Sequence, residues 1–557
     1  MRVALIFPPV FNPAQPYGSL NILATALKST VQDVIIWDWN LDFFEYVLSE
    51  KKQMKTGHSE EESFNPQIGS DILGTIRGEK FYQPSEYLNA MANLDRCLYQ
   101  WTSVFGKSAA SFWGFNSPYS SSSSDSIYSS TFDKEKNPFI YLYEAYYSAQ
   151  IEEYKPDLVG FSLVAQDQLI ATFTLARLIK TSFPSTYVCI GGPLVTYLQD
   201  SIANVAGRFE WIDAFVVGEG CEPLVQIAKH FDSKLHSNRI PNLITKYGRT
   251  FASYYSLNTL PQPSHEFISN KLYIAPEIVY PLLVKRGCNY SKCNFCSIPY
   301  VSQASNRTVE CLSPLKVVQT IEHLYDKKDF RFFFFNGESL LSKEVSQYAE
   351  EILLHRLDVY WYYWSRLENL KSNDLEKLFL AGCRKICFGF ETASNRLLRE
   401  MNKGNNIIAA EKLLKACKMT GIAPHLYVMI GYPTEQFDDI KYTLDFLVEK
   451  VDIASIYGLT ITVTEFDLER HSNIIQSPQS HGIQNIRNQQ DFAVSYQYSR
   501  QDGISSDDMA TRAEWLRKQL ATVLHGAQFI GSTNPHHLLY LRYLEMQRGA
   551  AKHYDKQ

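Results

Sequence analysis

The residues of this chain best placed to do chemistry are three cysteines in one short loop. Cys288, Cys293 and Cys296 have the spacing C-x4-C-x2-C and directly follow an apolar run. A closed structural metal site takes four protein ligands, whereas an iron–sulfur cube held by three thiolates keeps one iron open to another molecule. We therefore expect these cysteines to be the metal ligands of an open, catalytic [4Fe–4S] cluster.

The alternative for this loop is a zinc site that borrows a distant fourth ligand. His265 or Cys311 could in principle supply it. Zinc sites usually present two pairs of ligands, and this loop presents a triplet instead. The spacing therefore favours the iron–sulfur cluster over zinc.

Four of the apolar runs that follow the cysteine loop in the sequence end in short motifs that could bind a ligand. They are Gly337-Glu338, Arg366, Glu391 and Ile430-Gly431. A glutamate can accept from an ammonium or from sugar hydroxyls, and an arginine presents a planar pair of donors to a carboxylate. A glycine lets the backbone approach a flat ring. A solvated turn at Glu338, and a salt bridge at Arg366 or Glu391, remain the alternatives.

The elements that must position these motifs alternate between strand and helix. Strands are predicted at 281–286, 330–336, 359–366, 385–391, 425–431 and 455–463, with helical segments between them. Six such units fit a partial (β/α)6 barrel, in which the chemistry lies at the carboxyl ends of the strands. The cysteine loop comes directly after the first of these strands.

The N-terminal half carries a second alternation. Strands are predicted at 2–7, 33–39, 157–164, 187–193 and 212–217. This pattern predicts a doubly wound, Rossmann-like parallel sheet with ligands at the carboxyl ends of its strands. Those ends carry Ser162, Gly191-Gly192-Pro193 and Gly218-Glu219-Gly220. A nicotinamide dinucleotide is disfavoured, because no G-x-G-x-x-G follows the first strand.

Together the cysteine loop and the motifs after it resemble the radical SAM superfamily. In that family the loop follows the first barrel strand, and an aromatic residue precedes the last cysteine, as Phe295 does here. The commonest spacing in the family is C-x3-C-x2-C. The spacing here has one more residue between the first two cysteines, and in this it is similar to cobalamin-dependent members. The resemblance implies S-adenosylmethionine (SAM) on the open iron, with Gly337 and Glu338 at its amino group. It also implies Arg366 and Glu391 near the SAM carboxylate and ribose, and Ile430 and Gly431 near adenine.

One more run resembles the family but carries no assigned role. Met401-Asn402-Lys403-Gly404 recurs in such proteins, and a solvated turn explains it equally well.

The N-terminal glycine turns resemble the cobalamin-binding domain that precedes many radical SAM barrels. Ser162, Gly191, Gly192, Pro193, Gly218, Glu219 and Gly220 are the residues that this resemblance places near cobalamin. The chain lacks Asp-x-His-x-x-Gly, so the resemblance implies cobalamin without a histidine below the cobalt. A domain that has kept its fold and lost cobalamin is the alternative.

The expected fold class is α/β in four parts. Residues 1–235 are assigned to the Rossmann-like cobalamin-binding domain, with a helical, aromatic insertion at about 45–150. A linker at 236–280, the barrel at 281–470 and a mainly helical region at 471–557 follow. Within the insertion, the serine run at 117–130 predicts a flexible surface segment.

Composition excludes several classes of protein. The net charge of −5 gives no reason to expect nucleic acid or membrane as a partner. No run approaches the roughly 18 apolar residues of a membrane span. Ten cysteines in 557 residues are not a disulfide framework, and a cluster needs a reducing compartment, so we expect a cytoplasmic protein.

The function expected from the resemblance is C-methylation of an unactivated carbon through a 5′-deoxyadenosyl radical and methylcobalamin. Ring contraction, cyclisation or another rearrangement is the alternative. A methylthiotransferase is disfavoured, because only Cys97, Cys189 and Cys221 precede the barrel. A non-catalytic corrinoid- or zinc-binding protein is a distant possibility. The expected partners are a small-molecule or peptide substrate and an electron donor such as flavodoxin or ferredoxin.

Overall fold

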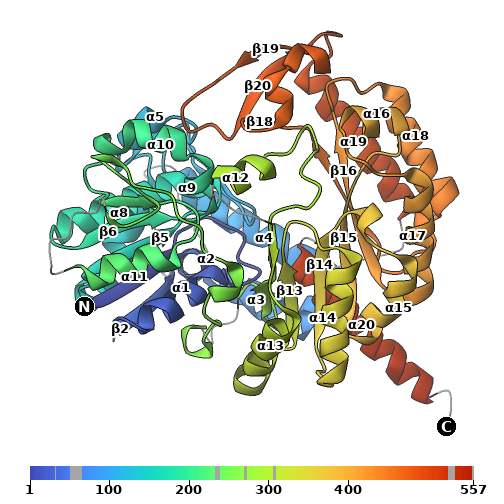
Figure 1. The fold of residues 1–557 in the computed structure, drawn as a ribbon, viewed down its shortest axis with the longest axis horizontal. Helices are drawn as coiled ribbons and strands as arrows, with labels where there is room; N and C mark the ends of the chain where they lie inside the picture. Colours follow the sequence, from blue (N-terminus) through green and yellow to red (C-terminus); the bar gives the residue numbers. More distant parts are fainter. Residues whose placement is uncertain are drawn as a thin grey trace. The chain divides into compact units, whose positions relative to one another are not determined.

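The computed structural model describes residues 1–31, 33–49, 66–231, 239–268, 273–304, 309–524 and 533–554. The chain forms two compact units. The first comprises Met1–Ile278 with Gln303–Arg307 and Gln490–Val494, and the second comprises Val279–Ser302, Thr308–Gln489 and Ser495–Gln557. Each unit is built around its own sheet, and helices pack against both sheets (Figure 1).

The first unit contains a seven-stranded sheet in the order β2-β1-β5-β6-β7-β8-β9. Its parallel strands are β1 (Arg2–Phe7), β2 (Asp33–Asp38), β5 (Leu158–Ser162), β6 (Tyr187–Gly191) and β7 (Ala214–Val216). The helices α1 (Ser19–Lys28), α8 (Leu169–Ser182), α9 (Pro193–Tyr197), α10 (Gln199–Val205) and α11 (Cys221–Lys229) connect or follow them. All five residues of β5 are buried, as expected for a central strand covered on both faces. The strand order reverses beside β1, which confirms the doubly wound arrangement.

The predicted linker at 236–280 requires a correction. It contains β8 (Leu243–Thr245) and β9 (Gly248–Arg249), which extend the first sheet in antiparallel fashion. The first unit therefore continues to Ile278, beyond the predicted boundary at residue 235. Strands of two and three residues are too short to show a hydrophobic period, so the sequence does not reveal them.

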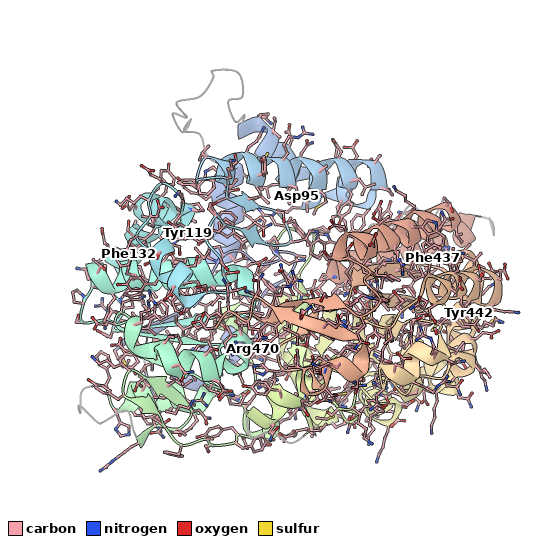
Figure 2. The ribbon with its side chains drawn as sticks, turned by 90° about the horizontal axis from the view of Figure 1, so that it is seen from above. Asp95, Tyr119, Phe132, Phe437, Tyr442 and Arg470 are labelled. Atoms are coloured by element: carbon pink, nitrogen blue, oxygen red, sulfur yellow. The ribbon has the colours of Figure 1, made fainter. Side chains whose placement is uncertain are left out.

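The insertion is helical and aromatic, as its composition indicates. Its helices are α2 (Trp39–Ser49), α3 (Pro66–Ile76), α4 (Pro84–Ser103), α5 (Ser124–Ser130), α6 (Pro138–Leu142) and α7 (Ser148–Tyr154), with a short hairpin of β3 (Ala109–Ala110) and β4 (Phe115–Asn116). Trp39 stacks on Tyr147 with ring centroids 4.2 Å apart. Asp95 lies on α4 (Figure 2). It accepts a hydrogen bond from the amide of Phe112, between β3 and β4, at 2.7 Å. Many of the aromatic residues of this region are therefore core residues.

The serine run at 117–130 is ordered, in contrast to the predicted flexible segment. It contains α5, which begins after Ser123, whose side chain accepts from the Ser126 amide. Ser122 Oγ accepts from Gln166 Nε2 at 2.7 Å, and Ser122 O accepts from the Phe492 amide at 2.8 Å. Serine hydroxyls bond to nearby backbone as readily as they bond to water, so composition alone misjudges such a segment.

The second unit contains a six-stranded parallel sheet whose strands follow one another in chain order. They are β10 (Val279–Leu283), β13 (Phe332–Asn336), β14 (Tyr360–Ser365), β15 (Cys383–Glu391), β16 (Ala423–Ile430) and β17 (Thr460–Glu465). The intervening helices include α13 (Pro314–Lys328), α14 (Ser342–Leu354), α15 (Leu375–Leu380), α17 (Ile407–Thr420) and α18 (Phe437–Asp445), with α13, α14, α15 and α17 outside the strands (Figure 1). Aromatic pairs stack between neighbouring strands, for example Phe335 on Trp361 at 4.5 Å. The expected fold of a partial (β/α)6 barrel is confirmed.

The C-terminal region is less helical than its sequence suggests. β18 (Leu468–Glu469), β19 (Ile483–Arg487) and β20 (Ser495–Arg500) form a three-stranded antiparallel sheet before the helices α19 (Ser506–Val523) and α20 (Asn534–Tyr554). Leu468, Ile474 and Ile483 pack in one cluster with Met401 and Tyr432. This small sheet therefore covers loops at the carboxyl ends of the barrel strands. Among the described residues, no helix combines the length and apolar character needed to cross a membrane.

Candidate functional site: the cysteine loop and its surroundings

The cysteine loop is fixed where it leaves the first barrel strand. β11 (Lys285–Arg286) pairs with β12 (Glu310–Cys311) directly before the loop. Lys285 is buried, and its Nζ lies 2.7 Å from Glu344 Oε2 and 2.5 Å from Asn289 Oδ1. A buried ammonium needs a charged or polar partner. The ion pair between Lys285 and Glu344 therefore holds the start of the loop against α14.

The three predicted cysteine ligands lie close enough together that, in addition to burial, Cys288 and Cys293 both raise the pKa of Cys296. Cys293 is buried, whereas Cys288 and Cys296 are partly exposed. Burial raises the pKa of Cys296 to about 12, and the nearby thiols of Cys293 and Cys288 add to this shift. Burial also raises the pKa of Cys293, while the charges of Lys403 and Arg366 oppose that rise. A metal must deprotonate such thiols when it binds, and neighbouring cations ease this step at Cys293.

The candidates for a fourth zinc ligand are placed as follows. Cys311 lies in β12, where its thiol is hydrogen-bonded to Glu344. His265 belongs to the first unit, in the short 3-10 helix His265–Phe267, and the cysteine loop belongs to the second. In the part of the chain that the structure describes, no three His, Cys, Asp or Glu side chains are grouped to hold a single metal ion.

Gly337 and Glu338 follow β13 directly, beside the start of the cysteine loop. A Cβ atom at Gly337 would lie 2.7 Å from Lys285 Cβ, so a larger residue does not fit. The carboxylate of Glu338 has one oxygen, Oε2, that is buried and bonded to no described residue. A buried carboxylate oxygen without a donor is costly, which makes it a fitting acceptor for a ligand ammonium.

Arg366 lies against the cysteine loop. Its Nη1 is 3.2 Å from Cys293 Sγ, and its guanidinium lies over the ring of Tyr290 at 3.8 Å. It also donates to the carbonyl of Lys403 and pairs with Glu368. These contacts place Arg366 beside Cys293, one of the predicted cluster ligands, while most of its donors are engaged by the protein itself.

Glu391 ends β15 in an unusual backbone conformation. Its φ of 64° is left-handed, and the pairing of β15 with β16 shifts register between Gly389 and Glu391. Such a conformation costs of order 1 kcal/mol and is often found where a side chain must be aimed. The carboxylate of Glu391 lies 2.7 Å from Lys403 Nζ, and both side chains are buried.

Ile430 and Gly431 end β16 and begin a tightly held turn. Gly431 has φ 95°, and its amide donates to Glu435 Oε2 at 2.6 Å. Burial raises the pKa of Glu435 to about 8. Arg500 on β20 donates to the carbonyls of Tyr432 and Glu435, at 3.0 and 2.8 Å. The small C-terminal sheet thus fixes the turn that the resemblance places near adenine.

In the first unit, the turns predicted near cobalamin follow three neighbouring parallel strands, β5, β6 and β7, and those after β6 and β7 contain glycine. Gly192 has φ 110°, and a Cβ atom there would lie 2.3 Å from Leu163 O. The Leu163 amide donates to Gly191 O at 2.8 Å, which joins the turns after β5 and β6. The Gly218 amide donates to Thr196 Oγ1 at 2.8 Å. The structure therefore brings Ser162, Gly191-Gly192-Pro193 and Gly218-Glu219-Gly220 to one edge of the sheet.

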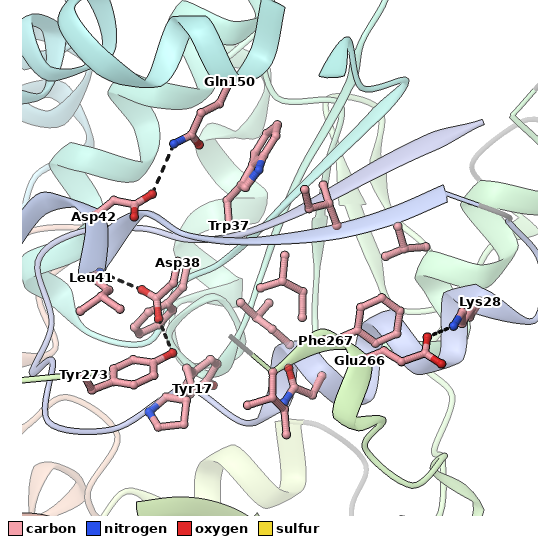
Figure 3. Close-up of a pocket in the computed structure, with 18 residues that line it drawn as sticks. Tyr17, Lys28, Trp37, Asp38, Leu41, Asp42, Gln150, Glu266, Phe267 and Tyr273 are labelled. Carbon is pink, nitrogen blue, oxygen red and sulfur yellow. Dashed lines mark hydrogen bonds and ion pairs between the residues drawn. The ribbon is translucent and has the colours of Figure 1, made fainter. Parts of the chain in front are cut away.

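A pocket of about 580 Å³ lies elsewhere in the first unit, along β2 (Figure 3). None of the residues predicted near cobalamin lines it. Asp38 in its wall accepts from the Leu41 amide at 2.9 Å and from Tyr273 Oη at 2.8 Å, and Lys28 pairs with Glu266. The charged side chains Asp38, Lys28 and Glu266 in this wall are thus bonded to the protein itself.

Several residues around the cysteine loop were not found from the sequence. Lys285, Tyr290 and Asn294 contact or belong to the loop, and Lys403 pairs with Glu391. Lys403 lies in the run 401–404, which was noted but left open between a role and a solvated turn. Its burial decides against the solvated turn.

Comparisons with known proteins agree with this geometry. Residues 282–447 match the family model of the radical SAM superfamily. An uncharacterized methyltransferase, PH0819, from Pyrococcus horikoshii is 23% identical over 54% of this chain and 66% of its own length. The anaerobic magnesium-protoporphyrin IX monomethyl ester cyclase of Cereibacter sphaeroides is 24% identical over 53% of this chain and 49% of its own. The chain thus spans about half to two thirds of the length of these relatives.

Solved structures extend the likeness to nearly the whole chain. The methyltransferase TsrM from Kitasatospora setae, solved with cobalamin and a [4Fe–4S] cluster, has a TM-score of 0.57 at 14% identity and covers 96% of this chain and 92% of its own. OxsB, a cobalamin-dependent SAM radical enzyme solved with aqua-cobalamin and SAM, has a TM-score of 0.59 at 13% identity over 98% and 71%. Residues 282–447 therefore match the radical SAM superfamily, and nearly the whole chain shares the overall fold of these two solved structures.

Proposed function

We propose that this chain is a cobalamin-dependent radical SAM enzyme that methylates an unactivated carbon. The observation that carries the proposal is the buried Oε2 of Glu338, which is bonded to no described residue and lies beside a loop of three cysteines. A cluster held by this loop would leave one iron open, and Glu338 fits the ammonium of a SAM molecule bound there. The first unit, with its two glycine turns after β6 and β7, would hold cobalamin in the same chain.

The residues of the chain would divide the work as follows. Cys288, Cys293 and Cys296 hold the cluster, and Glu338 and Glu391 orient SAM through its amino group and ribose. Gly431 leaves room for adenine, and Gly192 lets the backbone of its turn approach a corrin. The cofactors supply hydrogen abstraction from carbon and a methyl group for a carbon that is not nucleophilic. The protein positions the reactants and excludes water and oxygen.

The choice of methylation is supported by the names of relatives. PH0819 is named a methyltransferase, and a bacteriochlorophyllide d C-12(1)-methyltransferase of Chlorobaculum tepidum is 26% identical over 35% of this chain. The second candidate is a cyclisation or another rearrangement, because one relative is named a cyclase. In either case we propose a small-molecule or peptide substrate and a flavodoxin or ferredoxin as electron donor.

The test is an anaerobic reconstitution of the full chain with iron, sulfide and hydroxocobalamin. Iron, sulfide and corrinoid content would be measured, followed by turnover of SAM with a deuterated methyl group under a chemical reductant. We expect cluster, bound corrinoid, label on the corrinoid, and both 5′-deoxyadenosine and S-adenosylhomocysteine. Cys293→Ser should lose the cluster, while Glu350→Gln, an exposed residue paired with Lys377, should not.

The products distinguish the candidate reactions. Deoxyadenosine with bound corrinoid but no transferred label would favour a rearrangement. Zinc in place of iron, with SAM intact, would contradict the enzyme proposed here.

A further inference from the structure

We propose that residues 400–404, which we name the clasp, hold the cysteine loop in its cluster-binding form. The clasp joins α16 (Asn395–Glu400) to α17 and contains Lys403. The inference deepens the proposed function, because it assigns positioning residues to the same cluster site.

The clasp begins with a turn that exposes backbone carbonyls. Asn402 is left-handed, with φ 49°, and its amide donates to Arg399 O at 3.0 Å. The Lys403 amide donates to Leu398 O at 2.9 Å. These two bonds form a Schellman motif, in which a left-handed residue ends the helix. The next carbonyls have no partner within the helix and must find donors elsewhere.

The cysteine loop supplies those donors. Asn294, between the second and third cysteines, donates its amide to Met401 O at 2.9 Å and its Nδ2 to Glu400 O at 2.7 Å. Tyr290, between the first and second cysteines, donates its hydroxyl to Asn402 O at 2.8 Å. Three successive carbonyls at the end of one helix thus bind one loop.

Two further contacts make the attachment reciprocal. Asn402 Nδ2 donates to Lys292 O at 2.9 Å, so the clasp also binds the loop through a side chain. The carbonyl of Lys403 accepts from Arg366, whose guanidinium covers Tyr290 and whose Nη1 reaches Cys293 Sγ. The backbone of Lys403 is therefore connected to a cluster ligand through one side chain.

The side chain of Lys403 connects the clasp to the end of β15. Its Nζ lies 2.7 Å from Glu391 and 5.6 Å from the ring centroid of Phe295 in the loop. A Cβ atom at Gly389 would lie 2.7 Å from this Nζ, so glycine at 389 leaves room for the pair. The clasp thereby links the cysteines to Glu391, the residue expected at the ribose.

The test measures how easily the loop opens in the apo protein. Full-length chain would be treated with a thiol reagent, and the alkylation rate of each cysteine followed by peptide mass spectrometry. Tyr290→Phe removes the bond to Asn402 O and keeps the ring under Arg366. Asn402→Gly removes the bond to Lys292 O and keeps the left-handed turn. Each should accelerate alkylation of buried Cys293 about fivefold, the effect of one lost hydrogen bond.

The chain offers a matched control for each variant. Tyr360→Phe removes the hydrogen bond from the Tyr360 hydroxyl to Asp358. Tyr360 begins β14, whereas Arg366 follows the other end of this strand. Asn488→Gly alters another left-handed asparagine, with φ 52°, whose Nδ2 donates to Gln497 at 2.7 Å. Neither should alter the rate at Cys293. Cys383 and Cys417 are fully buried and report global opening.

Acceleration at Cys293 without acceleration at Cys383 and Cys417 would support the clasp. Rates equal to those of the controls, or equal acceleration at all cysteines in both variants, would overturn it. In the reconstituted enzyme, the variants should also shift the electron paramagnetic resonance spectrum of the reduced cluster. The apo measurement does not depend on the cofactor, so a wild-type chain that takes up no iron would contradict the proposed function alone.

Discussion

Glu338 has a carboxylate oxygen that is available to accept a hydrogen bond from a ligand. Its Oε2 is buried and bonded to no described residue, although Gly337 beside it is packed tightly against Lys285. The backbone of this turn is therefore fixed by the protein, while the carboxylate keeps one position for a donor. A SAM ammonium would occupy that position with a charge-assisted bond.

Glu338→Gln should weaken SAM binding roughly 10- to 100-fold, because it replaces a charged acceptor by a neutral one of the same shape. The iron content and the melting temperature should stay at the wild-type values, since the lost charge has no partner within the described chain. Equilibrium titration of the reconstituted protein with SAM measures the effect. Equal SAM affinity in Glu338→Gln and in the exposed variant Glu350→Gln would show that Glu338 does not bind SAM.

From the sequence we could predict which residues would contact a ligand, but not which residues hold those predicted contacts in place. The cysteines, Glu338 and Glu391 follow family motifs at the ends of apolar runs. Lys403 and Asn294 act through backbone carbonyls and a buried ion pair, which depend on where two distant segments meet. No local spacing reveals such a meeting, so these contacts required the structure.

Among the elements, the turn that follows α16 requires a glycine at position 404. Gly404 has φ 75°, and a Cβ atom there would lie 2.8 Å from Tyr290 Oη. Both its conformation and its contact therefore exclude larger residues, and the second demand comes from the cysteine loop.

Gly404→Ala should destabilise the fold by about 1 kcal/mol for the left-handed backbone, and by about 1 kcal/mol or more for the clash with Tyr290. Gly503→Ala is the matched control, since Gly503 has φ 78° and no atom within 4 Å of its Cβ position. Urea unfolding of both variants isolates the contact. If both lose the same free energy of unfolding, the contact with Tyr290 contributes nothing.

The turn after β16 predicts a dependence of stability on pH. Burial raises the pKa of Glu435 to about 8 in the folded chain, against an ordinary value of 4.5. The folded state then binds more protons than the unfolded state between these values, so this group makes stability fall as pH rises from about 4.5 to 8.

Glu435→Gln keeps a carbonyl to accept from the Gly431 amide and removes this titration. Relative to wild type, the variant should gain at least about 1 kcal/mol in free energy of unfolding between pH 5.5 and pH 8. Denaturant unfolding at both pH values measures the gain, and Glu449→Gln, at an exposed position, is the control. A parallel pH dependence in wild type and Glu435→Gln would mean that Glu435 is already ionised at pH 5.5.

The longer elements could be predicted from the sequence, and the shorter ones could not. The six barrel strands lie within a few residues of their predicted positions, because each is an apolar run between polar turns. β8, β9 and β18 have two or three residues each, and their position is set by the neighbours with which they pair. The same holds for the serine run, whose order depends on contacts with Gln166 and Phe492.

At the scale of the whole molecule, both sheets have a glycine with positive φ directly after a parallel strand. Gly192 in the first unit and Gly431 in the second both have positive φ and both follow a parallel strand. The alternation of strand and helix in the sequence was enough to predict both sheets, because it repeats over long stretches. It could not show that the first sheet continues past residue 235, where the pattern stops.

Because the two proposed cofactor sites lie in different units, a single substitution should impair binding of one cofactor and leave the other bound. A Cβ atom at Gly192 would lie 2.3 Å from Leu163 O, so Gly192→Ala must displace the turns that follow β5 and β6. The cysteine loop belongs to the other unit, and its contacts with the clasp and α14 do not involve this turn.

Gly192→Ala should therefore lower corrinoid content at least about tenfold and abolish methyl transfer to the corrinoid. The cluster should load normally, and SAM should still be cleaved to 5′-deoxyadenosine. Gly248→Ala is the matched control in the same unit, because Gly248 has φ 119° and no atom within 4 Å of its Cβ position. Corrinoid absorbance, iron content and product analysis on the same samples give the answer. Full corrinoid content in Gly192→Ala would place cobalamin away from this turn, whereas loss of both cofactors would show that the two sites do not load independently.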